Sequence, residues 1–263
     1  EMCIRDRYIR LDANLTLDEE NWEPIGNGTR SGSSFKGNSF RGVFDGNGMK
    51  ISGLKITDAA TNADDAIGLF GVLNGGTVQD LTLTDVQIDV TNGECVGGAI
   101  GLMVNGSTAS GITVGTENGN DTITAVRGLG GIVGRMTISG GIIDCVNYAT
   151  IKGTSEKSGN VGGIVGAAYY TDKNSWMIIS GCKNHGSLSN KCMGVGGIVG
   201  LSAANVENCE NTGAINGNGT SIGGIVGEQQ NAGHVIGCTN TAKITNTSTD
   251  FGTGGIIGWL RYN

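Results

Sequence analysis

A short glycine motif recurs along most of the chain. It consists of Gly-Gly, two apolar residues and Gly, and full copies begin at Gly97, Gly130, Gly162, Gly196, Gly223 and Gly254. A shorter copy spans Gly68 to Gly71, and the starts of successive full copies are 33, 32, 34, 27 and 31 residues apart. A unit of this size cannot bury its own apolar face, so such units must stack on one another. The repeat therefore predicts a solenoid.

A second motif lies between the glycine copies. The pattern Cys-x-Asn-x-(Gly/Ala)-x-(Ile/Leu) occurs four times without a gap, at Cys145–Ile151, Cys182–Leu188, Cys209–Ile215 and Cys238–Ile244. Apolar residues alternate with polar ones here, which is the period of a strand and not of a helix. We expect an all-β fold, a right-handed single-stranded parallel β-helix of about seven coils with three strands to a coil.

Both motifs have a predicted place in the coil. We expect the apolar pair of each glycine motif to lie on one short strand, with one residue of the pair facing inward. The cysteines and asparagines of the second motif are predicted to form a structural ladder, in which each asparagine amide bonds to the next coil. The ladder residues are Cys145, Cys182, Cys209, Cys238, Asn147, Asn184, Asn211 and Asn240. Reduced core thiols fit the cysteine spacing, and a disulfide between coils or a metal site remain as alternatives.

Composition limits the functional classes. Glycine accounts for 49 of 263 residues and proline for 1, which suits many paired strands. Aromatic residues are only 5%, so the core must be narrow. The formal net charge is -7 and no basic face is visible, which argues against a nucleic-acid partner. No apolar run reaches the roughly 18 residues that span a bilayer, so no membrane span is expected.

The two ends of the chain do not follow the repeat. Residues 1–10 fit no later pattern and are predicted to be a non-native or disordered tail of a metagenomic sequence. Residues 11–66 are expected to form an N-terminal module of the solenoid, and residues 67–263 its glycine repeats. The chain stops at Asn263, five residues after a glycine copy and with no closing cap. We therefore expect a fragment of a longer protein.

No group of residues has the signature of a catalytic or metal site. There are only two histidines, His185 and His234, and no His-Glu-x-x-His motif. Polysaccharide-cleaving β-helix enzymes gather acidic residues on one face, but the candidates fall in different phases of the repeat. These candidates are Asp64, Asp65, Asp85, Asp89, Asp121, Asp144 and Asp172. Asp45-Gly46-Asn47-Gly48 is too short for a calcium loop and predicts a tight turn. We expect no cofactor and no metal.

Threonine pairs raise an ice-binding hypothesis. Thr82-Leu83-Thr84 and Thr122-Ile123-Thr124 have the required alternation. Matching pairs are missing from the coils at Cys182 and Cys209, so the hypothesis is weak.

The repeats resemble the GLUG-motif family. The N-terminal stretch adds to the likeness, with Trp22-Glu23-Pro24-Ile25-Gly26, Phe35-Lys36-Gly37, Phe40 to Gly48 and Ile51 to Ile56 in the order of such proteins. The resemblance covers about residues 20 to 263. It implies secreted or wall-attached bacterial proteins, adhesin-like chains and accessory regions of immunoglobulin A peptidases. It implies no catalytic residue set.

We expect a non-catalytic extracellular or cell-surface segment of a bacterial protein, acting as an adhesin-like binder or a spacer. Its partner would be a host or cell-surface glycan or protein. Loops near Asn105, Asn118, Tyr169 to Trp176 and Gln229 to Asn231 would make the contacts. The alternative is a carbohydrate-active β-helix enzyme, either a polysaccharide lyase or a glycoside hydrolase.

Overall fold

The structure is a computed structural model that describes residues 8–17, 21–58, 65–91, 93–155, 159–169, 176–191, 193–230, 233–248 and 252–261. Within these residues the chain forms short strands and turns, with no α-helix. None of the described segments contains a helix long and apolar enough to cross a membrane.

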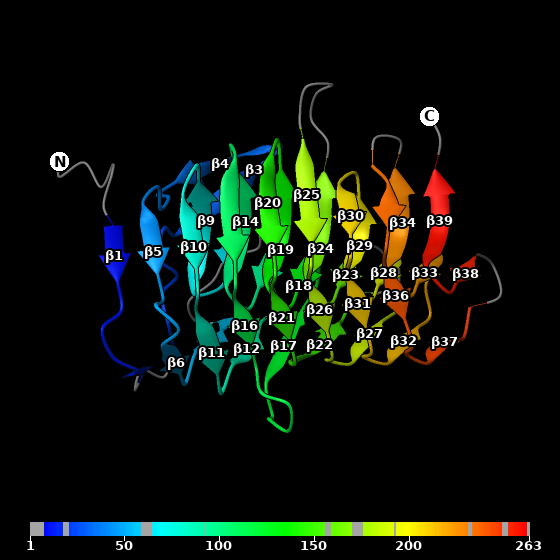
Figure 1. The fold of residues 1–263 in the computed structure, drawn as a ribbon, viewed down its shortest axis with the longest axis horizontal. Helices are drawn as coiled ribbons and strands as arrows, with labels where there is room; N and C mark the ends of the chain where they lie inside the picture. The colour runs from blue at the N-terminus through cyan, green and yellow to red at the C-terminus, as the bar shows by residue number, and fades with distance from the viewer. Residues whose placement is uncertain are drawn as a thin grey trace.

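Five parallel sheets run along the molecule, and each full coil gives one strand to each sheet (Figure 1). Sheet 1 contains β1 (Tyr8–Arg10), β5 (Val43–Asp45), β10 (Thr77–Gln79), β15 (Ser107–Ser110), β20 (Gly140–Ile143), β25 (Met177–Ser180), β30 (Asn205–Glu207) and β35 (Val235–Ile236). Sheet 2 contains β2 (Leu15–Thr16), β6 (Lys50–Ser52), β11 (Thr82–Thr84), β16 (Thr113–Val114), β21 (Val146–Asn147), β26 (Lys183–Asn184), β31 (Glu210–Asn211) and β36 (Thr239–Asn240).

The other three sheets have seven strands each. Sheet 3 contains β7 (Lys55–Thr57), β12 (Gln87–Asp89), β17 (Thr122–Ala125), β22 (Thr150–Gly153), β27 (Leu188–Asn190), β32 (Ile215–Gly217) and β37 (Ile244–Asn246). Sheet 4 contains β8 (Ala66–Ile67), β13 (Cys95–Gly97), β18 (Leu129–Gly130), β23 (Val161–Gly162), β28 (Gly194–Gly196), β33 (Ser221–Gly223) and β38 (Thr253–Gly254). Sheet 5 contains β9 (Phe70–Asn74), β14 (Ile100–Val104), β19 (Val133–Thr137), β24 (Val165–Tyr169), β29 (Val199–Ser202), β34 (Val226–Gln230) and β39 (Ile257–Arg261).

The predicted parallel β-solenoid of about seven coils is confirmed, but each coil has five strands and not three. Single-residue corners divide the coil more finely than the sequence pattern suggested. Between sheets 1 and 2, one residue has a positive φ in each coil from β10 onward, for example Asp144 at 52° and Gly181 at 66°. Such a residue turns the chain sharply, so the strands on either side are short.

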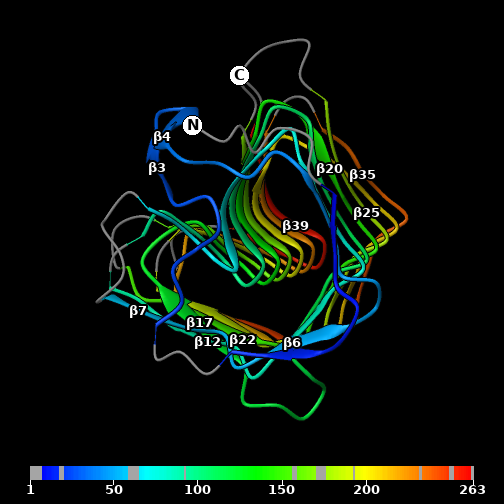
Figure 2. The ribbon, with the colours of Figure 1, turned by 90° about the vertical axis from the view of Figure 1, so that its left-hand side faces the viewer.

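The glycine motif crosses a corner and does not lie on one strand. In the third full copy, Gly162 ends β23, Gly163 and Ile164 form the bend, and Val165 begins β24. Ile164 and Val165 are both fully buried, so the prediction of one inward residue was wrong. The reason is that this corner points into the coil (Figure 2). Both apolar residues therefore meet the interior.

The final glycine of the motif lets sheets 4 and 5 pack backbone against backbone. A Cβ added to Gly166 would lie 2.5 Å from the carbonyl carbon of Gly128, which belongs to the coil before it. Real side chains do not approach backbone so closely. Glycine is therefore required at this position by the contact between neighbouring coils, as well as by the bend.

The core is continuous from coil to coil. In sheet 3 the inward column consists of aliphatic residues in parallel register, among them Ile88, Ile123 and Ile151. Three aromatic rings widen the core at the N-terminal end, where the Phe40 and Phe44 rings each lie 5.2 Å from the Phe70 ring.

The solenoid begins before the predicted boundary at residue 11. Tyr8–Arg10 form β1 and pair in parallel with Val43–Asp45 of β5, so residues 8–10 do not belong to a tail. Residues 1–7 lie outside the described residues. An antiparallel hairpin, β3 (Gly28–Ser31) and β4 (Ser34–Gly37), interrupts the first coil and lies outside the stack (Figure 2).

Candidate functional site

The predicted asparagines lie in one buried row on sheet 2. Asn147 Nδ2 donates to Asn184 Oδ1 at 2.9 Å, Asn184 Nδ2 to Asn211 Oδ1 at 2.8 Å, and Asn211 Nδ2 to Asn240 Oδ1 at 2.8 Å. Each amide also reaches the carbonyl two residues along its own chain, as from Asn184 Nδ2 to Gly186 O at 3.0 Å. The row thus closes a turn in every coil and joins the coils to each other.

The same column is apolar in the earlier coils. Val114 pairs with Asn147, and Leu83 pairs with Val114. A buried amide is stable only when its hydrogen bonds are made, and these need another amide above or below. Along the chain this column changes from Leu and Val to four consecutive asparagines. Each inner asparagine of the row therefore lies between two other asparagines.

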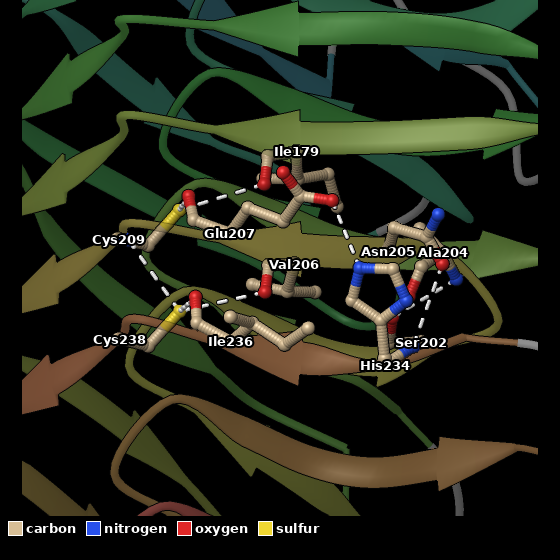
Figure 3. Close-up of polar contacts among 10 residues, drawn as sticks. All are labelled: Ile179, Ser202, Ala204, Asn205, Val206, Glu207, Cys209, His234, Ile236 and Cys238. Carbon is tan, nitrogen blue, oxygen red and sulfur yellow. Dashed lines mark hydrogen bonds and ion pairs between the residues drawn. The ribbon is translucent and has the colours of Figure 1, made fainter.

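The four predicted cysteines stand beside the asparagine row, one residue before each sheet 2 strand. All four carry free thiols, with Cys145, Cys182 and Cys209 buried and Cys238 half-buried. Each thiol donates to the carbonyl two residues before it, as from Cys209 Sγ to Glu207 O at 3.2 Å (Figure 3). Burial raises the pKa of the Cys182 thiol, which keeps it protonated at neutral pH.

The remaining cysteines are placed separately. Cys95 is buried on sheet 4, and Cys3 and Cys192 lie outside the described residues. Within the described ranges, no three His, Cys, Asp or Glu side chains group as metal ligands would.

The histidines make ordinary surface contacts. His185 stacks on Tyr148 with ring centroids 4.9 Å apart, and its Nδ1 lies 2.7 Å from Thr212 Oγ1. His234 Nε2 lies 2.8 Å from Glu207 Oε1 (Figure 3). Both side chains bridge neighbouring coils.

The candidate carboxylates that lie in the described residues do not gather at one site. Asp121 is buried and accepts backbone N–H groups of Val86 at 2.8 Å and Thr116 at 3.0 Å, so it holds a turn. Asp85 and Asp89 are exposed, and Asp144 stands at a corner. Asp65 accepts from Thr29 Oγ1, while Asp64 and Asp172 lie outside the described residues.

The threonine pairs and the Asp45 turn also have structural places. Thr82–Thr84 belong to sheet 2 and Thr122–Thr124 to sheet 3, so they form no common ice-binding row. Asn47 N donates to Asp45 Oδ1 at 2.8 Å and Met49 N to Gly46 O at 2.8 Å, which is a tight turn.

Sheets 4 and 5 meet at the inward corner, and we call the outer side of this corner the groove. One wall is a register column on sheet 5, which reads Val72, Leu102, Arg135, Ala167, Leu201, Glu228 and Trp259. At its N-terminal end the groove holds a small apolar cluster of Ala66, Val72, Cys95, Leu102 and Val104, separate from the main core. Phe35 of the hairpin packs on this cluster, so the hairpin covers this part of the groove.

Polar contacts fasten the hairpin across the groove. Thr29 Oγ1 donates to Asp65 Oδ1 at 2.9 Å, and Thr137 Oγ1 donates to Ser33 O at 3.2 Å. Arg30 forms an ion pair with Glu94, which also pairs with Arg127 at 3.0 Å. Beyond the hairpin the groove opens into a pocket.

The pocket has a volume of about 270 Å³ and contains three arginines. Its lining residues are Arg30, Glu94, Arg127, Gly128, Arg135, Gly159, Asn160, Ala167, Tyr169, Met193 and Leu201. The Arg135 guanidinium lies over the Tyr169 ring at 3.9 Å, and Asn160 Nδ2 donates to Tyr169 Oη at 3.4 Å. This is a positively charged cavity with an apolar wall, in a chain of net charge -7.

Of the described residues in the predicted contact loops, Tyr169 lines this pocket. Asn105 and Asn118 are exposed, Trp176 is exposed beyond a segment outside the described residues, and Gln229 is buried. The pocket arginines were not singled out from the sequence. A signal was present, because Arg135 directly follows a glycine motif at a position where other copies have Leu102, Ala167 and Leu201.

Comparisons with known proteins agree with this architecture. The family described as the GLUG motif matches residues 192–216 and 218–245. Halomucin of Haloquadratum walsbyi is 36% identical over 146 residues, which is 51% of this chain and 1% of halomucin. The chain therefore spans about a hundredth of that relative.

Two solved structures share the fold. A putative immunoglobulin A1 protease from Bacteroides ovatus matches with a TM-score of 0.69 and 19% identity, over 98% of this chain and 78% of that chain. A structure described as IgA1 Protease matches with a TM-score of 0.59 and 18% identity, over 96% of this chain and 19% of that one. These likenesses show that the chain shares the fold of the two solved structures and that residues 192–216 and 218–245 match the GLUG motif.

Proposed function

We propose that this chain is a non-catalytic extracellular segment of a bacterial surface protein, a stiff rod that holds an adhesin-like binding surface on its side. The observation that carries the proposal is that recurring side chains and variable side chains have different roles within each coil. The side chains that recur, the asparagine and cysteine rows and the glycine motifs, serve stacking. The side chains that differ between coils, such as those of the sheet 5 wall, face the outer groove.

Three further points support a surface role. Parallel strands in register give a rod that resists bending, which suits display away from a cell. Proteins similar to this chain bear the names halomucin and immunoglobulin A1 protease, which suggest an extracellular setting. The candidate carboxylates are scattered among turns and exposed faces, so they support a binding or spacer role over glycan cleavage.

The test combines binding with turnover. The purified chain would be screened on a glycan array and incubated with acidic and neutral polysaccharides, with reducing ends and unsaturated products measured. We expect selective binding and no product. New product that is lost when one carboxylate is substituted would instead establish the enzyme alternative.

Adhesion separates a binder from a spacer. Beads coated with this chain should adhere to glycan-coated surfaces more strongly than beads coated with an unrelated β-solenoid of equal length. Equal adhesion by the two rods, together with a blank array, would contradict the binding role.

A further inference from the structure

Three arginines line the pocket beside one carboxylate of the described lining, Glu94. Glu94 forms ion pairs with Arg30 and Arg127. No ion pair joins Arg135 to a carboxylate of the described residues. Guanidinium groups bind carboxylates through paired, charge-assisted hydrogen bonds. The charge of the pocket therefore selects an anionic ligand.

Arg135 Nε, which is a donor, and Asn160 Oδ1, which is an acceptor, are buried at the pocket and have no hydrogen-bond partner among the described residues. Asn160 is more than nine-tenths buried, with an exposed fraction of 8%. A buried polar group without a hydrogen-bond partner destabilises the fold, and native structures contain few such groups. A simple anion would satisfy only the arginine, because Asn160 Oδ1 needs a hydroxyl or N–H donor.

The rest of the lining is apolar. Ala167, Leu201 and Met193 form this part of the wall, and Leu201 is buried. Sugar rings combine a carbon-bound hydrogen face with hydroxyl donors. Pockets for drug-sized ligands hold roughly 300–1,000 Å³, so a cavity of about 270 Å³ suits one ring of a glycan.

We propose that this pocket binds an acidic sugar residue, a hexuronate of a glycan. Arg135 and Arg127 hold its carboxylate, Asn160 Oδ1 accepts a hydrogen bond from a ring hydroxyl, and the ring packs on Ala167 and Leu201. The stacking of Arg135 on Tyr169 fixes the guanidinium before the ligand arrives, which reduces the entropy cost of binding. This inference rests on the proposed binding role and names its ligand class.

Calorimetric titration of the full chain with trigalacturonate tests the proposal. The matched control ligand is its methyl ester, which keeps the hydroxyls and loses the charge. We expect one saturable site for the acid, and binding of the ester weaker by about tenfold or more. Inorganic sulfate should bind much more weakly than the acid. Equal binding of acid and ester, or sulfate binding as tight as the acid, would overturn the proposal.

Four variants assign the binding to this pocket. Arg135→Gln and Arg127→Gln should each weaken it by about tenfold. Glu94→Gln should strengthen it severalfold, because it removes the carboxylate that competes with the ligand for Arg127; a gain of affinity cannot result from misfolding. Lys152→Gln, an exposed residue on sheet 3, removes the same charge elsewhere and should change nothing. Unchanged affinity in both Arg135→Gln and Glu94→Gln would refute the assignment.

The bead assay separates this inference from the proposed function. Adhesion that persists in Arg135→Gln would remove the pocket from the binding role and leave the surface role intact. Pocket binding in solution without bead adhesion would contradict the adhesin-like role alone.

Discussion

The side-chain amide of Asn184 lies against Gly163 of the preceding coil, so that a Cβ added to the glycine would come 2.2 Å from Asn184 Cγ. The same relation recurs between Gly131 and Asn147, at 2.3 Å. The two repeat motifs of the sequence are therefore complementary halves of one contact. The second glycine of four copies leaves the space that the asparagine row occupies; these are Gly131, Gly163, Gly197 and Gly224.

A first prediction concerns this contact. Gly163→Ala should destabilise the chain by about 3 kcal/mol, because the methyl group meets both the Asn184 amide and the Gly197 carbonyl at 2.2 Å. Gly141→Ala is the control, since its added methyl would make only ordinary contacts of 3.5 to 3.7 Å. Urea denaturation of both variants measures the difference. Equal unfolding free energies would show that the glycine row is not required by close packing.

The asparagine row gives a second prediction. Asn184→Ala removes the donor to Asn211 Oδ1 and to Gly186 O, and the acceptor of Asn147. The loss should be about 3 kcal/mol, since buried groups are left without partners. Asn216→Ala, on the exposed face of β32, should cost less than about 0.5 kcal/mol. A similarly small loss of unfolding free energy in both variants would mean that the asparagine row adds no stability.

A third prediction follows from the buried Cys182 thiol. Its pKa is raised above 9.0 by burial, so the folded chain keeps the proton where the unfolded chain releases it. The thiol's contribution to stability is therefore complete below pH 9 and declines as the pH rises, by up to about 1.4 kcal/mol per pH unit. The unfolding free energies of the original chain and Cys182→Ala should converge between pH 8 and pH 10.5. A difference in unfolding free energy that stays constant across this pH range would contradict the raised pKa of Cys182.

Thiol labelling provides a fourth prediction. Cys145 and Cys182 are fully buried, whereas Cys238 in the last coil is half-buried. In a Cys3→Ser, Cys192→Ser background, Cys238 should react with a thiol reagent at least about tenfold faster than the other two, because only they require the coils to open. Mass spectrometry of labelled peptides identifies the order. Simultaneous labelling would show that the coils separate together.

A fifth prediction concerns the hairpin over the groove. Phe35→Ala should weaken its docking by about 1–2 kcal/mol, since the ring packs on the Leu102 and Val104 cluster. Amide hydrogen exchange of residues 28–37 should then speed up, with no change in sheets 1 and 2. Lys36→Ala, an exposed neighbour in β4, should leave exchange unaltered. Faster exchange throughout the chain would indicate that the hairpin stabilises the whole solenoid.

Much of the fold was predictable because it depends on local repetition. The spacing of the glycine motif fixes the length of a coil, and alternation around Cys182 and Asn184 identifies a strand with one buried face. The number of strands was not predictable, because the corners need only one residue, as at Asp144. The inward direction of the glycine corner was not predictable either, because it depends on Gly163 meeting Asn184 across the interior.

The repeats were enough to predict that the units stack and that the asparagines and cysteines recur once per coil. The contacts of the groove were not predictable from them: a hairpin from the first coil covers its N-terminal end, and Arg30 pairs with Glu94, 64 residues further along. Stacking follows from a repeated local pattern, whereas the groove depends on where side chains from different coils and an inserted hairpin come together in space.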